Sequence, residues 1–378
     1  MDFTQLLKVM TERGGSDLFI TAGAPPSIKV DGTIKPLTKE SLTAAQSRAL
    51  VYSTMNDKQL AEFEATNECN FALSAHDIGR FRVSAYVQRN SPGMVLRSIA
   101  SHIPSMEELK LPEVIKELAM SKRGLILFVG GTSTGKSTSL ASMIDYRNEN
   151  HAGHIITIED PIEYIHNHKK SIITQREVGL DTDSFETALK NTLRQAPDVI
   201  LMGEIRSSDT MSYGLAFAET GHLCLATLHA NNANQALDRI ISFFPADHHD
   251  QIWMDLSLNL KAIIAQQLVP TKDGKGRRAA IEVMINTPLI QDLIRKGAVH
   301  EIKDVIKKST NLGMKTFDQS LYDLYREDVI TYETALSHAD SANDLRLMIK
   351  LSADGNEKPT QADDMPSFTL QDEEDKRG

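Results

Sequence analysis

Two different spacings of apolar residues divide the chain. In the first hundred residues, an amphipathic helix is predicted at residues 3–12 and short strands at 17–21 and 27–30. Asp31 and Gly32 follow the second strand and signal a hairpin, because glycine readily adopts the positive φ of tight turns. Residues 1–103 are therefore predicted to form a small α+β domain.

A period of two runs from residue 79 to residue 87, which is the pattern of a half-buried strand. Its apolar face consists of Phe81, Val83, Ala85 and Val87. The opposite face carries Arg80 and Arg82. Taken alone, these arginines and Arg97 are typical of a solvated sheet face.

Past residue 124 the pattern changes to continuous apolar runs separated by helical stretches. Such runs are typical of a parallel sheet that helices cover on both faces. An α/β domain is predicted, and its strands are residues 125–129, 154–158, 199–202 and 223–227.

After about residue 247 the pattern is mostly helical and predicts a helical annex. Its candidate helices are residues 251–268, 289–296, 300–307 and 316–327. The second domain is placed at 124–350, after a linker at 104–123 that contains Pro104 and Pro112. Residues 351–378 are poor in large apolar side chains and are predicted to form a disordered acidic tail.

Length and composition fit a globular protein with two domains. The chain has 378 residues, whereas a single core usually stops growing at about 250 to 300. No apolar run approaches the roughly 18 residues of a spanning helix, and the start lacks signal-peptide features, so a cytoplasmic location is expected. Cys69 and Cys224 form no Cys-x-x-Cys pair and are expected to be reduced packing residues.

The charge balance argues against nucleic acid as a ligand. The net charge is −10 at pH 7, and nucleic-acid binding depends on Lys and Arg contacts to phosphate. Much of this charge is local, because residues 352–378 hold eight acidic and three basic residues. The tail is read as a solubilising extension, with a contact to a basic surface as the alternative.

A glycine-rich loop with the spacing of a phosphate-binding P-loop follows the first strand of the second domain. It supplies glycines whose backbone N–H groups wrap phosphates, a lysine for the β and γ oxygens and a hydroxyl for Mg²⁺. A helix follows it, and the helix N-terminus favours an anion. The predicted nucleotide-binding residues are Gly130, Gly131, Thr132, Ser133, Thr134, Gly135, Lys136, Ser137 and Thr138.

Two acidic clusters at strand ends are candidates for hydrolysis, which needs a carboxylate to orient the attacking water. Glu159, Asp160 and Glu163 follow one apolar strand, and Pro161 keeps the chain extended there. Glu204 ends the apolar run 199–202 after a glycine, the arrangement of a Walker B carboxylate. Two histidines, His222 and His229, flank another strand; taken alone, each is typical of a hydrogen-bonded structural histidine.

Four segments in order resemble the secretion ATPase family of type IV pilus and type II secretion motors. They correspond to its Walker A, Asp box, Walker B and His box, and lie at residues 130–138, 158–164, 194–206 and 220–229. Residues 15–18 and 26–32 are similar to the short PAS-like N-terminal domain of the retraction branch. The resemblance covers about residues 1–350, and it implies an α/β fold with a RecA-like P-loop NTPase domain beside the PAS-like α+β domain.

The resemblance also implies an ATPase that forms a homohexameric ring, with ATP between its two domains. Glu163 would be the catalytic carboxylate that polarises water. Glu204 and Ser137 would serve Mg²⁺, the former through water. Arg82 and Arg97 would be catalytic arginines that reach the γ-phosphate.

His222 and His229 would couple the γ-phosphate to the neighbouring subunit. The P-loop departs from the family pattern at Gly131 and Ser133, where Pro and Gly are usual, but it keeps every phosphate ligand. Residues 289–294 differ from the family's retraction motif, and Gln291 stands where that motif has arginine. If that arginine is needed for retraction in the family, this chain would need a partner motor.

Several features favour pilus retraction among the family's tasks. The chain lacks the long N-terminal region and the four-cysteine zinc site of assembly and type II secretion motors, and its acidic tail resembles that of the accessory retraction motor. Expected partners are a paralogous retraction ATPase and an inner-membrane platform protein at the cytoplasmic face. The alternatives are an assembly or secretion motor, a regulatory ATP-binding adaptor in a paralogue's ring, and a RecA-like nucleic-acid translocase.

Overall fold

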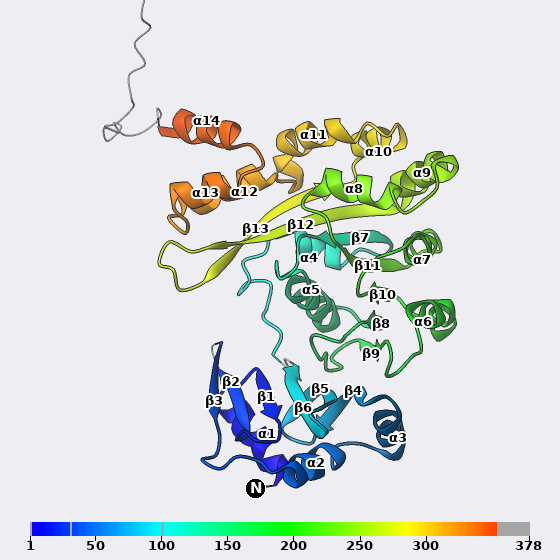
Figure 1. Ribbon diagram of the computed structural model, residues 1–378. Helices are drawn as coiled ribbons and strands as arrows, with labels where there is room; N and C mark the ends of the chain where they lie inside the picture. The colour runs from blue at the N-terminus through cyan, green and yellow to red at the C-terminus, as the bar shows by residue number, and fades with distance from the viewer. Residues whose placement is uncertain (1, 31, 100–101, 354–378) are drawn as a thin grey trace, which may run out of the picture.

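The N-terminal part of the chain is built on an antiparallel sheet of six strands. A computed structural model describes residues 2–30, 32–99 and 102–353. The sheet order is β3-β2-β1-β6-β5-β4, and the helices pack against it (Figure 1). The elements are α1 (Phe3–Glu12), β1 (Asp17–Ile20), β2 (Ser27–Val30), β3 (Thr33–Pro36), α2 (Ala44–Tyr52), α3 (Asp57–Thr66), β4 (Glu68–Ala75), β5 (Gly79–Gln88) and β6 (Ser91–Ile99).

The core of this N-terminal sheet lies between its apolar face and the three helices. Phe81, Val83 and Ala85 of β5 are buried there, as the period of two predicts, while Val87 is only half-buried. The predicted hairpin is present, since Val30 pairs with Thr33 across a turn in which Gly32 has a φ of 78°. The pairing of β2 with β3 therefore follows from a local turn signal.

The second part of the chain is a seven-stranded sheet between helices. Its order is β13-β12-β7-β11-β10-β8-β9; β13 alone is antiparallel to its neighbour. Alternate residues of the central strand β7 belong to two different apolar cores, so both faces are covered. The elements are α4 (Val114–Ala119), β7 (Gly124–Val129), α5 (Lys136–Asn150), β8 (His154–Glu159), β9 (Ile172–Glu177), α6 (Phe185–Thr192), β10 (Val199–Met202), α7 (Ser208–Glu219), β11 (Leu223–Leu228), α8 (Ala233–Ile241), α9 (His249–Asn259), β12 (Leu260–Pro270) and β13 (Arg277–Ile285).

Further helices cover the β12–β13 end of this sheet (Figure 1). They are α10 (Pro288–Arg295), α11 (Ile302–Lys308), α12 (Phe317–Arg326), α13 (Tyr332–His338) and α14 (Ala342–Ala353). The α/β fold class is confirmed. The predicted acidic tail begins inside the last turn of α14, and residues 354–378 lie outside the described residues.

The helix predicted at 251–268 is wrong. Helix α9 ends at Asn259, and the rest of that stretch belongs to β12, which pairs with β7 on one side and β13 on the other. A continuous apolar run buried on both faces has the same pattern in a buried helix and in a central strand. Strands β9 and β13 were also not predicted.

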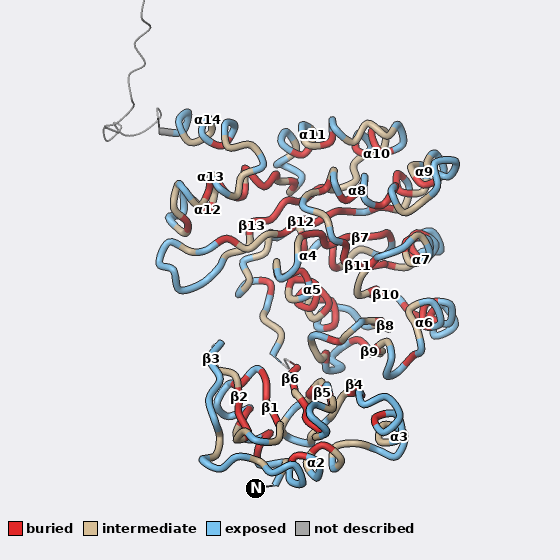
Figure 2. The backbone as a smooth tube through the Cα atoms, in the orientation of Figure 1, coloured by how far each residue is buried: buried red, intermediate tan, exposed pale blue. Residues whose placement is uncertain are grey.

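The predicted linker, residues 104–123, contributes to the core of the second part. Ile115 and Leu118 of α4 are buried against it. The strands β7 and β12, which run through this core, are mostly red in Figure 2. The buried Arg147 of α5 donates from Nη1 to the carbonyls of Ala119 and Ser121, at 2.6 and 2.8 Å. Helix α4 is thus fixed to the P-loop helix.

Strand register brings several loops to one edge of the sheet. Val129 of β7 pairs with Leu228 of β11, and Met202 of β10 pairs with Ile158 of β8. Because these strands are parallel, the loops that follow them emerge side by side, at the edge where α/β proteins bind ligands.

Candidate active site

The P-loop between β7 and α5 has a backbone that only glycine tolerates at two points. Gly130 has a φ of 155°, and a Cβ there would lie 2.4 Å from the carbonyl oxygen of Gln266. Gly135 has a φ of 87°, and its Cβ would lie 2.7 Å from Nε2 of Gln266. The loop therefore fits closely against β12, and its N–H groups and the α5 N-terminus form an anion cradle.

Lys136 is buried and keeps its ammonium group inside the loop. Its Nζ donates to the carbonyl oxygens of Gly130 and Gly131, at 2.9 and 2.6 Å. Burial lowers the pKa of Lys136, and the charge of Glu204 opposes that shift. A cation desolvated in this way interacts strongly with a phosphate oxygen.

Gln266 of β12 supports the loop and was missed by sequence reasoning, because it lies in the stretch predicted as helix. Its Nε2 donates to the carbonyl of Thr134 at 2.8 Å, and its Oε1 accepts from Oγ of Ser139 at 2.8 Å. One side chain thus bridges the P-loop and the first turn of α5. The strand assignment of β12 is what reveals it.

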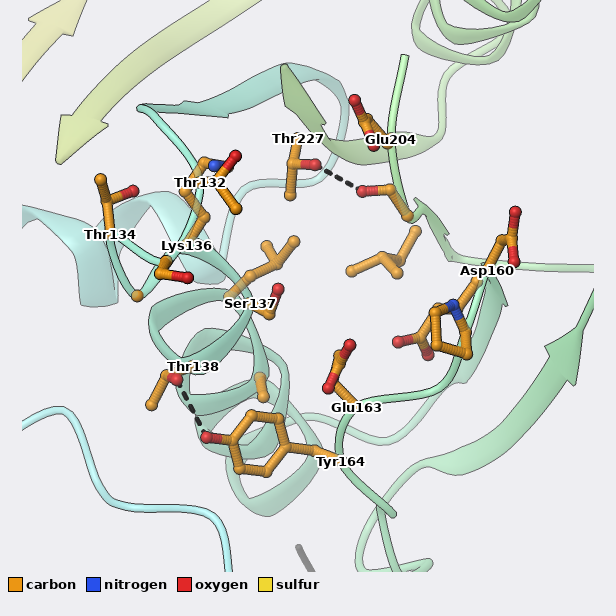
Figure 3. Close-up of a pocket in the computed structure, with 18 of the residues that line it drawn as sticks. Thr132, Thr134, Lys136, Ser137, Thr138, Asp160, Glu163, Tyr164, Glu204 and Thr227 are labelled. Carbon is orange, nitrogen blue, oxygen red and sulfur yellow. Dashed lines mark hydrogen bonds between the residues drawn. The ribbon is translucent and has the colours of Figure 1, made fainter. Parts of the chain in front are cut away.

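A cavity of about 540 Å³ opens in front of the P-loop. Its walls come from the P-loop, the segment after β8, and the ends of β10 and β11 (Figure 3). Leu268 and Arg277 of the β12–β13 pair line another side. Arg277 was not predicted as a site residue, because two adjacent arginines match no binding motif.

Glu163 faces this cavity from the segment after β8. In Figure 3 its carboxylate points toward Ser137, the P-loop residue predicted to serve Mg²⁺. Glu163 is exposed, and the peptide bond between Asp160 and Pro161 just before it is cis. A carboxylate here can orient a water molecule on the phosphate side of the cavity.

Glu159, at the end of β8, has a desolvated carboxyl group although the residue retains some exposure. Burial raises the pKa of Glu159 to about 7, against hydrogen bonds from Thr157 and Gln175 that lower it. Oγ1 of Thr157 donates to its Oε1 at 2.7 Å. The backbone N–H of Glu163 also lowers this pKa. The Glu159 carboxyl group therefore lies near the backbone that carries Glu163.

Glu204 follows β10 and is held between two basic side chains. Its Oε2 accepts from Nε and Nη2 of Arg206, at 2.8 and 2.6 Å, and its Oε1 lies 3.2 Å from Nε2 of His229. The structure thus joins the Walker B and His-box segments at the cavity wall. Thr227 ties the two strands further by donating to the carbonyl of Gly203 at 2.6 Å.

The oxygen donors beside the P-loop suit Mg²⁺, which prefers oxygen ligands and keeps several waters. Ser137 offers an exposed hydroxyl, and the Glu204 carboxylate is already engaged by Arg206 and His229. In the part of the chain that the structure describes, there is no cluster of three or more His, Cys, Asp or Glu able to hold a metal ion. This donor set fits an ion whose other ligands are phosphate oxygens and water.

Outside the P-loop, three predicted site residues do not line the cavity, and within the P-loop Gly130 and Gly131 do not line it either. His222 lies at the start of β11, at the opposite end of the strand from His229, and its Nδ1 lies 3.1 Å from Oγ1 of Thr220. Arg97 pairs with Asp17, with 2.8 Å between Nε and Oδ1. Arg82 pairs with Arg97 in the β5–β6 register, and its charge acts on Glu177 of β9.

A family model and curated relatives match most of the chain. Residues 2–324 match the family model described as Type II/IV secretion system protein. The chain is 68% identical over 369 residues to the type IV pilus ATPase PilU of Pseudomonas aeruginosa, covering 98% of this chain and 95% of that relative. It is 43% identical to the type IV pilus retraction ATPase PilT of the same organism, covering 90% and 98%.

A solved structure resembles the whole fold. The crystal structure of the pilus retraction motor PilT with bound ADP superposes with a TM-score of 0.86 at 41% identity, covering 92% of this chain and all of that one.

Among the residues described here, none of the helices is long and apolar enough to cross a membrane.

Proposed function

The chain belongs to the type II/IV secretion system protein family, and from this premise we propose that it is an ATPase whose hydrolysis powers type IV pilus retraction. One observation carries the chemistry. A single cavity is lined by the P-loop lysine, by the exposed Glu163 and by the paired Glu204. Phosphate binding and water activation therefore meet in one place.

Each of these residues has a separate task in hydrolysis. The N–H groups of the P-loop and the ammonium of Lys136 bind the phosphates of ATP and offset charge in the transition state. Glu163 orients the attacking water and accepts its proton. Ser137, and Glu204 through water, would hold Mg²⁺, which would supply further positive charge to the phosphates.

The motor is a homohexameric ring in which the N-terminal domain turns over the ATPase domain. The positions of Arg82 and Arg97 support this, since each must leave its present neighbours before it can act at a phosphate. His222 lies away from its own cavity, which supports a role at the neighbouring subunit. Arginines that reach a transferring phosphate are worth roughly 10³ to 10⁵ in rate.

The ring works at the cytoplasmic face of the inner membrane, where it contacts a pilus platform protein and a paralogous retraction ATPase. Identity to PilU and to PilT, two proteins of one organism, supports the idea of paired motors. The adaptor alternative has one observation in its favour. Gln291, on α10, stands where the family's retraction motif carries an arginine.

The test of the chemistry is ATP turnover by the purified protein and two variants. Glu163→Gln should lower kcat by about 10² to 10⁴ while a fluorescent ADP analogue still binds. Glu219→Gln, which changes an exposed glutamate at the end of α7, is the matched control and should hydrolyse ATP at the normal rate. Full turnover by Glu163→Gln would refute the role of Glu163, and no turnover by the unmodified protein would favour the adaptor.

The test of the role is complementation of a pilus-retraction defect, with the chain alone and with a paralogue. Restored retraction in either case supports the proposal. A strain that lacks this protein and assembles no pili would identify an assembly motor instead. Stimulation of hydrolysis by DNA would identify a nucleic-acid translocase.

A further inference from the structure

The segment that presents Glu163 has little regular structure of its own. Residues 160–166 leave β8 as an irregular chain with a single bridge residue before β9 begins at Ile172. In such a segment, the regular backbone hydrogen bonds of a helix or sheet do not set the position of a side chain. Hydrogen bonds from neighbouring side chains must do so.

Gln175 of the edge strand β9 supplies three of these bonds. Its Nε2 donates to the carbonyl oxygen of Tyr164 at 2.9 Å and to Oε1 of Glu159 at 3.3 Å. Its Oε1 accepts from the backbone N–H of His166 at 2.8 Å. These contacts flank Glu163 on both sides along the chain.

Two further contacts hold the same segment. The hydroxyls of Tyr164 and Thr138 lie 2.9 Å apart, which fixes the residue after Glu163 to the P-loop helix, as the dashed line in Figure 3 shows. The buried carboxylate of Glu177 accepts from the backbone N–H of Ile162 at 3.2 Å. Glu163 thus lies between residues that are held from α5 and from β9.

We propose that Gln175 is a positioning residue that holds Glu163 over the P-loop through its three hydrogen bonds to Glu159, Tyr164 and His166. The proposal rests on the proposed function, since it assumes that Glu163 works on water. Gln175 does not touch the phosphates, because it does not line the cavity. Its effect therefore falls on the rate of chemistry and leaves nucleotide binding intact.

The chemistry of the amide matches this task. The segment presents two acceptors, the carbonyl oxygen of Tyr164 and the carboxylate of Glu159, and one donor, the N–H group of His166. A single partner for all three must therefore offer two donated hydrogen bonds and one acceptor. Only Gln and Asn side chains combine donors and an acceptor in one planar group, and the shorter Asn does not have the same reach. A methionine would fill similar space and make none of these bonds.

The neighbouring residue offers a matched control. Thr174 lies on the same strand and is half-buried like Gln175, but its Oγ1 lies 2.9 Å from Nε2 of His154 instead. Thr174→Val removes one side-chain hydrogen bond from β9 without touching the Glu163 segment. It should leave kcat unchanged.

The experiment measures kcat, KM for ATP, affinity for a fluorescent ADP analogue and melting temperature in the full chain. Gln175→Met and Gln175→Glu should each lower kcat by about 10- to 100-fold, since a displacement of about 1 Å can cost 10²-fold. Affinity for the ADP analogue should stay within about threefold. Gln175→Glu keeps the acceptor and loses both donors, so it should resemble Gln175→Met.

A double-mutant cycle separates positioning from general damage. In a Glu163→Gln background the catalytic carboxylate is gone, so Gln175→Met should cause no further loss of kcat. An equal fold-loss in both backgrounds, or normal kcat in Gln175→Met, would overturn the proposal. Failure of Glu163→Gln itself to lower kcat would instead overturn the proposed function.

Discussion

Glu282 is predicted to make the free energy of unfolding depend on pH, with a sign and size that follow from its surroundings. It is 2% exposed on β13, and its Oε1 accepts from the backbone N–H of Ala233 at 2.9 Å. Burial raises the pKa of Glu282 to about 7 from an ordinary value of 4.5. The N–H groups of Ala233 and Phe317 and the charge of Lys303 oppose this shift, whereas the charge of Asp340 adds to it.

The folded protein therefore binds a proton at Glu282 more tightly than the unfolded chain does. Its contribution to stability is present below pH 4.5 and is lost as the pH rises through about 7. One pKa unit is worth about 1.4 kcal/mol, so the whole change is about 3 kcal/mol. About 2 kcal/mol of it falls between pH 5.5 and pH 8.0.

The perturbation is Glu282→Gln, which keeps an oxygen for Ala233 and removes the titration. Relative to the unmodified protein, its free energy of unfolding should increase by about 2 kcal/mol between pH 5.5 and pH 8.0. Other titrating groups, such as His166, whose pKa burial lowers to about 4, cancel in this difference. Only the change with pH is predicted, since the substitution also has a pH-independent effect.

Urea unfolding followed by the fluorescence of Trp253, the single tryptophan, measures this difference in the second part of the chain. Glu301→Gln removes one exposed carboxylate from the same region and is the control for charge alone. A difference between Glu282→Gln and the unmodified protein that is the same at both pH values would contradict a raised pKa of Glu282 in the folded protein. So would a difference that favours the variant more at pH 5.5.

Two substitutions at the active site have equally definite outcomes. Gly130→Ala should abolish binding of a fluorescent ADP analogue, because the new Cβ would lie 2.4 Å from the carbonyl oxygen of Gln266 in a backbone region that disfavours side chains. Gly276→Ala is its control, since the nearest atom there is 3.8 Å away, and retained binding by Gly130→Ala would contradict the clash. Tyr164→Phe removes the bond to Thr138 and should lower kcat a few-fold at unchanged ADP affinity in the same assays; an unchanged kcat would show that this bond does not help to place Glu163.

The sequence alone predicts those parts of the protein whose pattern is local. The P-loop follows from the spacing of Gly130, Gly135 and Lys136, because each residue type meets a need of a bound phosphate within one turn of chain. Four of the parallel strands, β7, β8, β10 and β11, follow from continuous apolar runs, and the β2–β3 hairpin follows from Gly32. These features depend on neighbours a few residues away.

The order of the four family motifs added to this α/β domain the expectation of a RecA-like ATPase motor. It also gave roles to Glu163 and Glu204, which the acidic clusters at the strand ends had already indicated and which line one cavity with Lys136. Their meeting follows from the register of β7, β8, β10 and β11, since parallel strands deliver their following loops to one edge.

Tertiary structure alone decided what surrounds these residues. Gln266 contacts Thr134 of the P-loop although the two residues are 132 positions apart in the sequence. This contact depends on residues 260–270 forming a strand, which the apolar pattern did not predict. Gln175 holds the Glu163 segment from a strand that periodicity did not predict. Arg97 pairs with Asp17 on the neighbouring strand of its own sheet, and the charge of Arg82 acts on Glu177 of the other sheet, a relation between domains that no local pattern encodes. Contacts of this kind depend on strand order and on how elements pack, whereas the P-loop depends only on the residues within it.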